Sequence, residues 1–226
     1  MRQTFSRSHE PAIRAPKVVL VLIGFFILAH LARMASPVAD EWLLTYFAFF
    51  TFRGEIGSSP ALLLANGWSP VSYAFLHADW GHLAINSFWI LAFGSAVAQR
   101  LGTMRFLMLS ALCAAAGAAA HWLTDMSGHS VLIGASAAIS GQMAAAVRLI
   151  YAGGANLGGD TLLVRPLSLR ELAHNRQAMV FLAMWAGLNV LFGAGGIMGG
   201  DMNIAWVAHF GGFFAGLLTF GWFDRR

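Results

Sequence analysis

Six long apolar stretches follow one another along the chain and are separated by shorter polar segments. Their approximate bounds are 18–34, 80–99, 106–123, 136–151, 178–192 and 203–223. Within them apolar residues run continuously and do not alternate with polar ones, which favours helices over the strands of a membrane β-barrel. Stretches of about 20 apolar residues are long enough to cross a bilayer. The pattern predicts an all-α membrane protein, a bundle of six transmembrane helices.

The segment between the first two apolar stretches, residues 35–79, is different in character. It mixes scattered charges with short amphipathic pieces such as 42–47, which holds Trp42 and Phe47. Aromatic residues with scattered charges are typical of the bilayer interface, and loops of this length usually have a function. We expect a partly helical loop that is partly embedded in the outer leaflet. An ordinary solvated loop is the alternative.

The composition agrees with a membrane protein. Hydrophobic residues make up 58% of the chain and charged residues only 11%, against about 25% charged residues in soluble domains. The net charge of +4 could suggest a nucleic-acid partner, but the basic residues lie in short loops beside apolar stretches, where they set membrane orientation. We therefore expect the lipid bilayer, and no nucleic acid, as the environment. The single cysteine, Cys113, excludes an intrachain disulfide.

The distribution of charge predicts the orientation of the six helices. If the amino terminus is inside, every Lys and Arg except Arg33 and Arg53 falls on the inner side, and six of the ten acidic residues fall outside. This bias fits the positive-inside rule and places both termini in the cytoplasm. We expect a tail over 1–17, a helical domain over 18–223 with an uncleaved first helix, and an end over 224–226. The bacterial inner membrane is the expected location.

Ser136 is the first candidate for chemistry. It follows Gly134 and Ala135 at the predicted start of a helix. One interpretation is packing alone, because small residues at four-residue spacing, such as Ser136 and Ser140, let helices approach closely. In the other, Gly134 allows a tight turn, the hydroxyl projects into a cavity, and the free amides at the helix start stabilise an oxyanion.

His209 is the second candidate. An ionisable side chain at membrane depth is costly and is a functional candidate by default. A buried histidine bonded to a carbonyl, or a metal ligand, are the alternatives, but no set of Cys, His or carboxylates with metal spacing accompanies it. Gly212 and Gly216 form a small face that predicts close approach of the fourth and sixth helices. That approach would bring the imidazole within hydrogen-bond reach of Ser136.

The pair then has the chemistry of a nucleophile and its general base. Asp125 and Asp201 are the candidate third members, but both fall in predicted loops. We therefore expect a Ser–His dyad and not a triad.

Two further polar residues precede Ser136 in the chain. His82 and Asn86 are four residues apart and so share a helix face. They can donate hydrogen bonds to a developing oxyanion, or they can form a polar packing pair. His77 is expected to have a supporting or structural role.

Three motifs together resemble the rhomboid intramembrane serine proteases. They are Gly-Ala-Ser at 134–136 with Ser-Gly at 140–141, His-Leu-Ala-Ile-Asn at 82–86 after Phe-Leu-His at 75–77, and Ala-His-Phe-Gly-Gly at 208–212. The resemblance covers about residues 18–223. It implies Ser136 as nucleophile, His209 as base, and His82, Asn86 and the Ser136 N–H as oxyanion hole.

The resemblance also implies a water-filled cavity open to the outer face, and a gate formed by the fifth helix and the loop before the sixth. The implied substrates are membrane proteins with an unstable transmembrane helix. No cofactor and no metal are implied, and no oligomeric state is specified.

The chain departs from the family pattern at several positions. Ala137 stands where Gly is common, and Ser140 stands where an aromatic often stacks on the histidine. The end of the second helix, 93–100, lacks the usual Glu, and the first loop lacks a Trp-Arg pair. An inactive rhomboid-like protein that binds membrane helices is the alternative. A transporter would show internal repeats or paired broken helices, which the sequence lacks.

Overall fold

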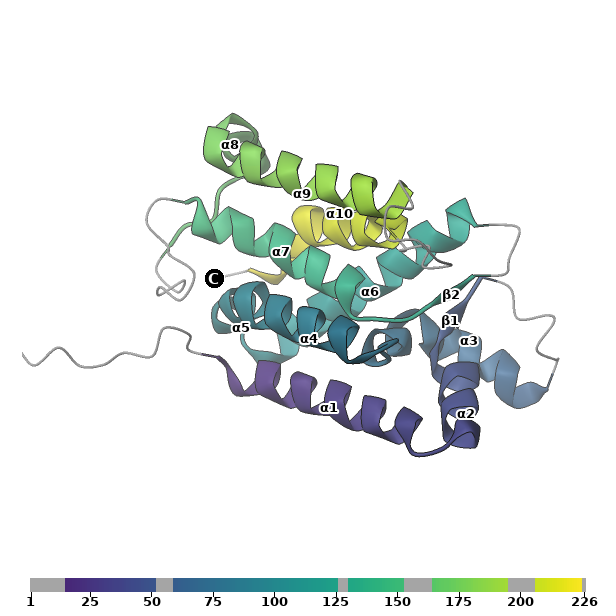
Figure 1. Ribbon diagram of the computed structural model, residues 1–226. Coiled ribbons are helices and arrows are strands. Elements are labelled where there is room, and N and C mark those ends of the chain that lie inside the picture. The colour runs from purple at the N-terminus through teal and green to yellow at the C-terminus, as the bar shows by residue number, and fades with distance from the viewer. Residues whose placement is uncertain (1–14, 52–58, 126–129, 153–163, 195–205, 225–226) are drawn as a thin grey trace, which may run out of the picture.

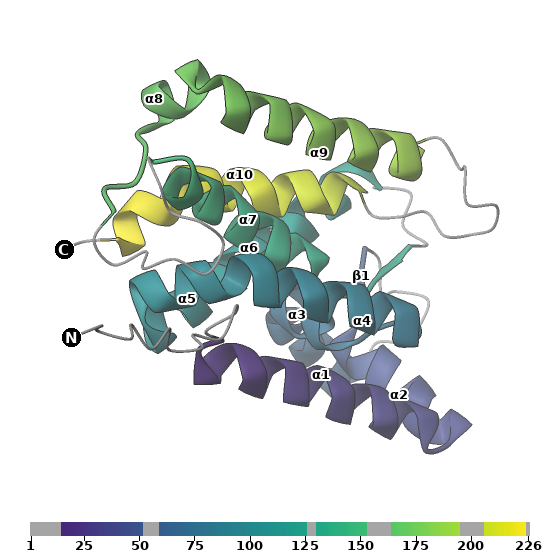
Figure 2. The ribbon, with the colours of Figure 1, turned by 60° about the vertical axis from the view of Figure 1, so that its left-hand side comes forward.

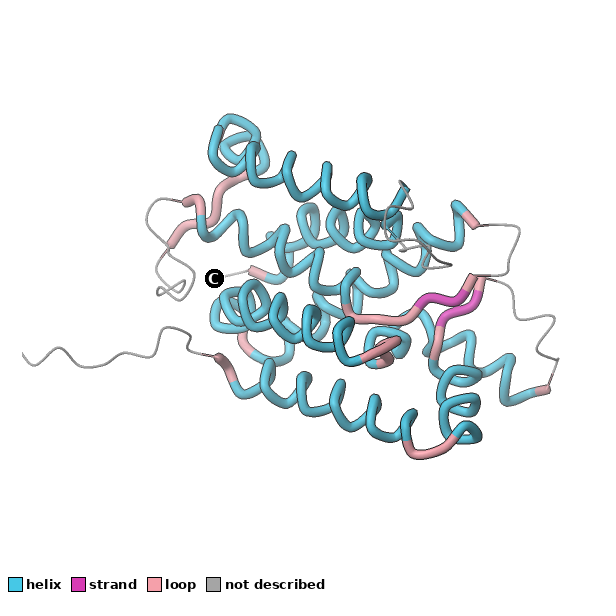
Figure 3. Tube along the Cα trace, viewed as in Figure 1, coloured by secondary structure: helices cyan, strands magenta, loops and turns pink. Residues whose placement is uncertain are grey.

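The computed structural model describes residues 15–51, 59–125, 130–152, 164–194 and 206–224. Nearly all of them are helical (Figures 1 and 3). The helices are α1 (Lys17–Met34), α2 (Pro37–Phe47), α3 (Pro60–Ser72), α4 (Trp80–Trp89), α5 (Ser95–Leu101), α6 (Thr103–Thr124), α7 (Ser136–Ile150), α8 (Leu169–His174), α9 (Arg176–Ala194) and α10 (Trp206–Phe223). A 3₁₀ turn (Tyr73–Phe75), a π-turn (Ile90–Gly94) and two short strands, β1 (Phe49–Phe50) and β2 (Val131–Leu132), complete the described elements.

Four helical segments are long and apolar enough to cross a membrane. They are α1, the continuous segment Trp80–Leu101 formed by α4, the π-turn and α5, then α6 and α10. The stretches 136–151 and 178–192 are also helical, as α7 and α9, but they are not among these four. The 15 residues of α7 span about 22 Å, which is less than the roughly 30 Å of a hydrocarbon core.

The centre of the bundle is formed by α6, α7 and α10, which pack backbone against backbone. A Cβ added to Gly212 or Gly216 of α10 would overlap the carbonyl oxygen of Ala137 or of Gly141 in α7. A Cβ on Gly141 would in turn overlap Cys113 of α6. The predicted close approach of the helices around Gly212 and Gly216 is therefore confirmed.

The predicted helical content of the first loop is confirmed, since it contains α2 and α3. Strand β1 of this loop pairs with β2 in antiparallel register, Phe49 opposite Leu132 and Phe50 opposite Val131. The N–H of Gly134 donates to the carbonyl of Tyr73 at 3.0 Å. The loop is thereby fastened to the segment that leads into Ser136.

The long helical segments, with α4 and α5 taken as one, run alternately in opposite directions, and α1 and α9 lie on opposite flanks (Figures 1 and 2). The start of α1 and the end of α10 lie at one end of the bundle, and the starts of α4, α7 and α10 lie at the other (Figure 1). At the first of these ends, Arg100 of α5 donates to Asp224 through two hydrogen bonds of 2.7 and 2.9 Å. Three parts of the predictions lie outside the described residues, namely most of the amino-terminal tail, residues 225–226 and Asp201.

Candidate active site

Ser136 and His209 meet at the end of the bundle where α7 and α10 begin. Ser136 is the first residue of α7 and His209 the fourth of α10. The Nε2 atom of His209 lies 2.8 Å from the Oγ atom of Ser136, although 73 positions separate them in the chain. This distance is that of a hydrogen bond between hydroxyl and imidazole. Because Ser136 is the first residue of its helix, its own N–H is not used by the hydrogen bonds within the helix.

The turn before Ser136 requires glycine. Gly134 has a φ of +113°, which side chains with a Cβ rarely adopt. A Cβ at this position would also lie 2.6 Å from Nε2 of His82. The absence of a side chain at Gly134 therefore lets the chain turn into α7 and lets the His82 ring come close to the turn.

His82 and Asn86 approach this turn from α4. Asp79 caps α4, and its carboxylate accepts the N–H of His82 at 2.8 Å. Nδ1 of His82 accepts the N–H of Ala78 at 3.4 Å, so the proton of the neutral ring is on Nε2, the atom nearest to Gly134. The buried amide of Asn86 donates to the carbonyl of His82 at 2.9 Å, which uses one of its two N–H groups.

His77 lies behind His82 and has structural contacts. Its ring is completely buried, with ring centres 4.9 Å from Phe26 and 5.2 Å from His82. Its carbonyl accepts hydrogen bonds from Arg33 and from His30 of α1. Burial, with a smaller contribution from His82, lowers the pKa of His77 to about 4, so the ring is neutral at physiological pH. His77 thus links α1 to the segment that holds His82.

The two departures next to Ser136 have local explanations. The side chain of Ser140 donates to the carbonyl of Ser136 at 2.8 Å, so it bonds within its own helix and does not replace the missing aromatic against His209. The methyl group of Ala137 faces Gly117 of α6, where a Cβ would lie only 2.5 Å from it. The missing side chain at Gly117 provides the space that Ala137 needs.

A residue that the sequence did not single out contacts His209. Oδ1 of Asn189, from α9, lies 2.6 Å from Nδ1 of His209. The sequence interpretation considered carboxylates only. Of these, Asp125 accepts hydrogen bonds from Thr51 and Ser130. The sequence does hold one signal for Asn189, because it is the one amide side chain within the apolar stretch 178–192.

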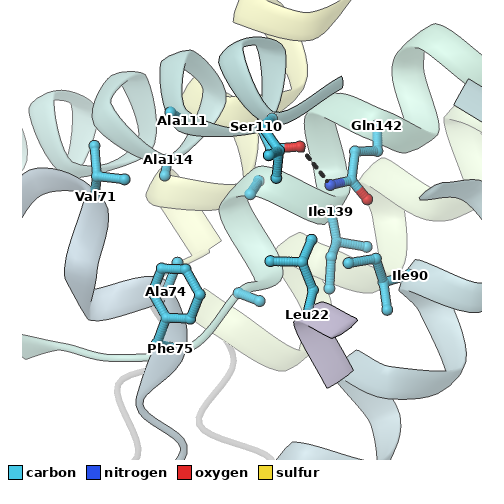
Figure 4. Close-up of a pocket in the computed structure, with 13 residues that line it drawn as sticks. Leu22, Val71, Ala74, Phe75, Ile90, Ser110, Ala111, Ala114, Ile139 and Gln142 are labelled. Atoms are coloured by element: carbon cyan, nitrogen blue, oxygen red, sulfur yellow. Dashed lines mark hydrogen bonds between the residues drawn. The ribbon is translucent and has the colours of Figure 1, made fainter. Parts of the chain in front are cut away.

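A cavity of about 230 Å³ lies beside the start of α7. Its lining is mostly apolar and comes from α1, α3, the two short turns, α6 and α7, with one polar pair, Gln142 and Ser110, joined by a 2.9 Å hydrogen bond (Figure 4). Neither Ser136 nor His209 lines it, and the water-filled cavity that the resemblance implies stays a prediction. Within the described residues, no three His, Cys, Asp or Glu side chains are grouped to hold a metal ion.

Fold and site together define a helical membrane protein with a Ser–His pair at one end of its central helices. The family model of the rhomboid domain matches residues 65–226. The chain is 30% identical over 160 residues to proteins named rhomboid protease GlpG from Yersinia pestis (strain Pestoides F) and Yersinia pseudotuberculosis serotype O:3 (strain YPIII), an alignment that covers 70% of this chain and 49% of each relative. The chain belongs to the rhomboid family and is an integral membrane protein. It spans about half the length of the curated relatives it matches.

Proposed function

We propose that this chain is an intramembrane serine endopeptidase that hydrolyses peptide bonds in or near transmembrane segments of membrane proteins. The observation that carries the proposal is the 2.8 Å contact between Nε2 of His209 and Oγ of Ser136. A hydroxyl is a weak nucleophile, and an adjacent general base activates it. Membership of the rhomboid family, and relatives named rhomboid proteases, support the same reaction.

In the proposed reaction, Oγ of Ser136 attacks the scissile carbonyl while Nε2 of His209 takes its proton. The tetrahedral intermediate collapses to an acyl-enzyme when His209 returns this proton to the leaving amine. Water, deprotonated by His209, then attacks the ester carbonyl, and His209 returns this proton to Oγ of Ser136 as the Oγ–acyl bond breaks.

The negative charge that forms on the carbonyl oxygen needs hydrogen-bond donors. We assign this role to the N–H of Ser136, the Nε2–H of His82 and the second N–H of Asn86. The assignment is supported by the hydrogen bonds at Nδ1 of His82 and at the Asn86 amide, which leave these two donors available. It is also supported by the proximity of the His82 ring to Gly134, two residues before the nucleophile.

We further propose that α7 and α9 cross the bilayer with the four apolar segments, which makes six spans over residues 18–223. In this arrangement the loop with α2 and α3 is partly embedded in the outer leaflet, and both termini are cytoplasmic. The charge bias of the sequence supports this orientation. We propose the bacterial inner membrane as its location, since the relatives named above come from the bacterial genus Yersinia.

The test is cleavage of a model transmembrane substrate in liposomes by the parent protein, Ser136→Ala and His209→Ala. We expect cleavage by the parent only, with all three proteins equally folded. Equal cleavage by all three would identify a contaminating protease. Failure of the parent to cleave several substrates, together with no labelling of Ser136 by a fluorophosphonate, would favour the alternative, an inactive rhomboid-like protein that binds membrane helices.

A further inference from the structure

Asn189 contacts the side of the His209 ring that faces away from Ser136. We propose that Asn189 is the positioning residue of the catalytic base. In this role its amide oxygen accepts the Nδ1–H of His209 and keeps Nε2 free of a proton toward Ser136. The inference rests on the proposed function, because His209 is a base only if Ser136 is the nucleophile. It gives the α9 helix a part in catalysis that acts through the orientation of His209.

The hydrogen bonds around Asn189 indicate which nitrogen of the neutral His209 ring carries the proton. Nδ2 of Asn189 lies 2.9 Å from the carbonyl oxygen of Trp185. A carbonyl only accepts, so the NH₂ group faces Trp185 and the amide oxygen faces His209. The ring nitrogen next to that oxygen, Nδ1, must then carry the proton. Nε2 is left as an acceptor, 2.8 Å from the hydroxyl of Ser136.

This arrangement explains how His209 is held without an aromatic ring on α7. In the resemblance noted above, that ring would stand at Ser140, but the Ser140 hydroxyl bonds to its own helix. The 2.6 Å contact from Asn189 fixes both the tautomer and the ring orientation, the two properties that a third group supplies in a serine-protease triad. An amide does so without placing a charge in the membrane.

Asn189 is held in place by a stripe of three residues on α9. Trp185, Asn189 and Gly193 are spaced four apart and lie on one helix face. Trp185 stacks on Phe213 of α10 with ring centres 4.6 Å apart. A Cβ on Gly193 would overlap atoms of the Trp206 side chain in α10.

Trp185 and Gly193 therefore hold α9 against α10 one helical turn before and one helical turn after Asn189. A shift of α9 away from α10 would remove the Asn189 oxygen from the ring. The tautomer of His209 thus depends on how α9 packs against α10.

The direct test is the protonation state of the His209 ring. We would record ¹⁵N NMR spectra of protein labelled in histidine and identify His209 by the signals lost in His209→Gln. The parent and Ser136→Ala are expected to carry the proton on Nδ1. In Asn189→Leu, which keeps the shape of the side chain but removes the acceptor, we expect a mixture of tautomers or a proton on Nε2. An unchanged Nδ1–H state in Asn189→Leu would overturn the proposal.

The kinetic test uses the same variants in the cleavage assay. Asn189→Leu is expected to lower kcat about 10- to 100-fold with little change in KM, since the lost hydrogen bond orients the base and does not hold the substrate. Asn189→Asp keeps an acceptor and should restore most of kcat. Leu188→Ala, at an exposed neighbouring position of α9, is the matched control and should behave as the parent.

The two proposals fail in distinguishable ways. If the parent cleaves and Asn189→Leu cleaves equally well, Asn189 has no positioning role and the protease assignment stands. If the parent neither cleaves nor reacts with a fluorophosphonate, the protease assignment fails. The NMR comparison then still decides whether Asn189 sets the tautomer of His209.

Discussion

Gly212 of α10 lies against the carbonyl oxygen of Ala137 in α7, so closely that a Cβ at position 212 would overlap it. Ala137 follows Ser136, and Gly212 comes three residues after His209. The contact therefore sets how near the helices that carry the two candidate catalytic residues can come. Small residues at such crossings let helices pack closely where lipid offers no hydrophobic driving force between them.

Gly212→Ala should separate α7 from α10. We expect loss of cleavage and a decrease of about 1–3 kcal/mol in the free energy of unfolding, the usual range for an overpacked core. Thermal unfolding in mild detergent and the cleavage assay would measure both. Gly221→Ala is the matched control, because Gly221 is on the same helix with nothing within 4 Å of an added Cβ. Equal effects of the two substitutions would contradict this explanation.

Gly134→Ala should impair the turn before Ser136 in two ways. The φ of +113° is unfavourable for alanine, and the new methyl group would lie 2.6 Å from Nε2 of His82. We expect kcat to fall far more than stability does. Gly102→Ala separates the two causes, because Gly102 also has a positive φ, +74°, but an added Cβ there meets nothing within 4 Å. If both variants lost activity alike, the contact with His82 would be irrelevant.

Asn86→Ala should lower kcat by about 10²–10³-fold, the usual cost of removing one oxyanion-hole donor. KM should change little if the donor acts mainly on the transition state. The measurement is the separate determination of kcat and KM for one peptide-bond cleavage. Asn86→Asp has a similar shape but no N–H to donate, so it should be as impaired as Asn86→Ala. Retention of full activity by either variant would remove Asn86 from the proposed oxyanion hole.

The ion pair between Arg100 and Asp224 should contribute strongly to stability. Their side chains are only 8% and 7% exposed, and removing one partner of a buried pair costs about 3–5 kcal/mol because the other charge stays buried. We expect this loss for Asp224→Asn in thermal unfolding. Arg165 pairs with Glu171 but is 74% exposed, so Arg165→Gln should cost about 0–1 kcal/mol. A comparable loss of unfolding free energy in both variants would show that the contribution of these ion pairs does not depend on their burial.

The lowered pKa of Asp79 predicts that the free energy of unfolding depends on pH. The hydrogen bond from the N–H of His82 lowers the pKa of Asp79 below its usual value. A carboxyl whose pKa is lower in the folded protein stabilises it above the unfolded pKa, and this stabilisation is lost as pH falls through the folded pKa. Asp79→Asn keeps a capping side chain but not the charge. The parent should be more stable than this variant at neutral pH, and the difference should vanish in acid. A difference independent of pH would exclude this cause.

The helices were largely predictable from the sequence because each depends on a local apolar run. The stretch 18–34 corresponds to α1, and 106–123 lies within α6. The start of α7 at Ser136 was also predicted, since Gly134 and Ala135 mark a turn. The prediction of one plain helix over 80–99 missed the π-turn at Ile90–Gly94, for which hydropathy carries no signal.

The sequence by itself determined the membrane character, the helical class and the candidate pair Ser136 and His209, because polar groups inside apolar runs are costly and therefore conspicuous. Only the tertiary structure decided the other long-range contacts. The contact of Asn189 with His209, the pairing of β1 with β2 and the bond from Arg100 to Asp224 join segments far apart in the chain. The first of these contacts depends on how closely α9 approaches α10, and close approaches of this kind occur where a glycine on one helix faces its neighbour, as Gly193 faces Trp206 and Gly216 faces Gly141. Hydropathy along one chain segment does not encode which neighbour its glycines will face.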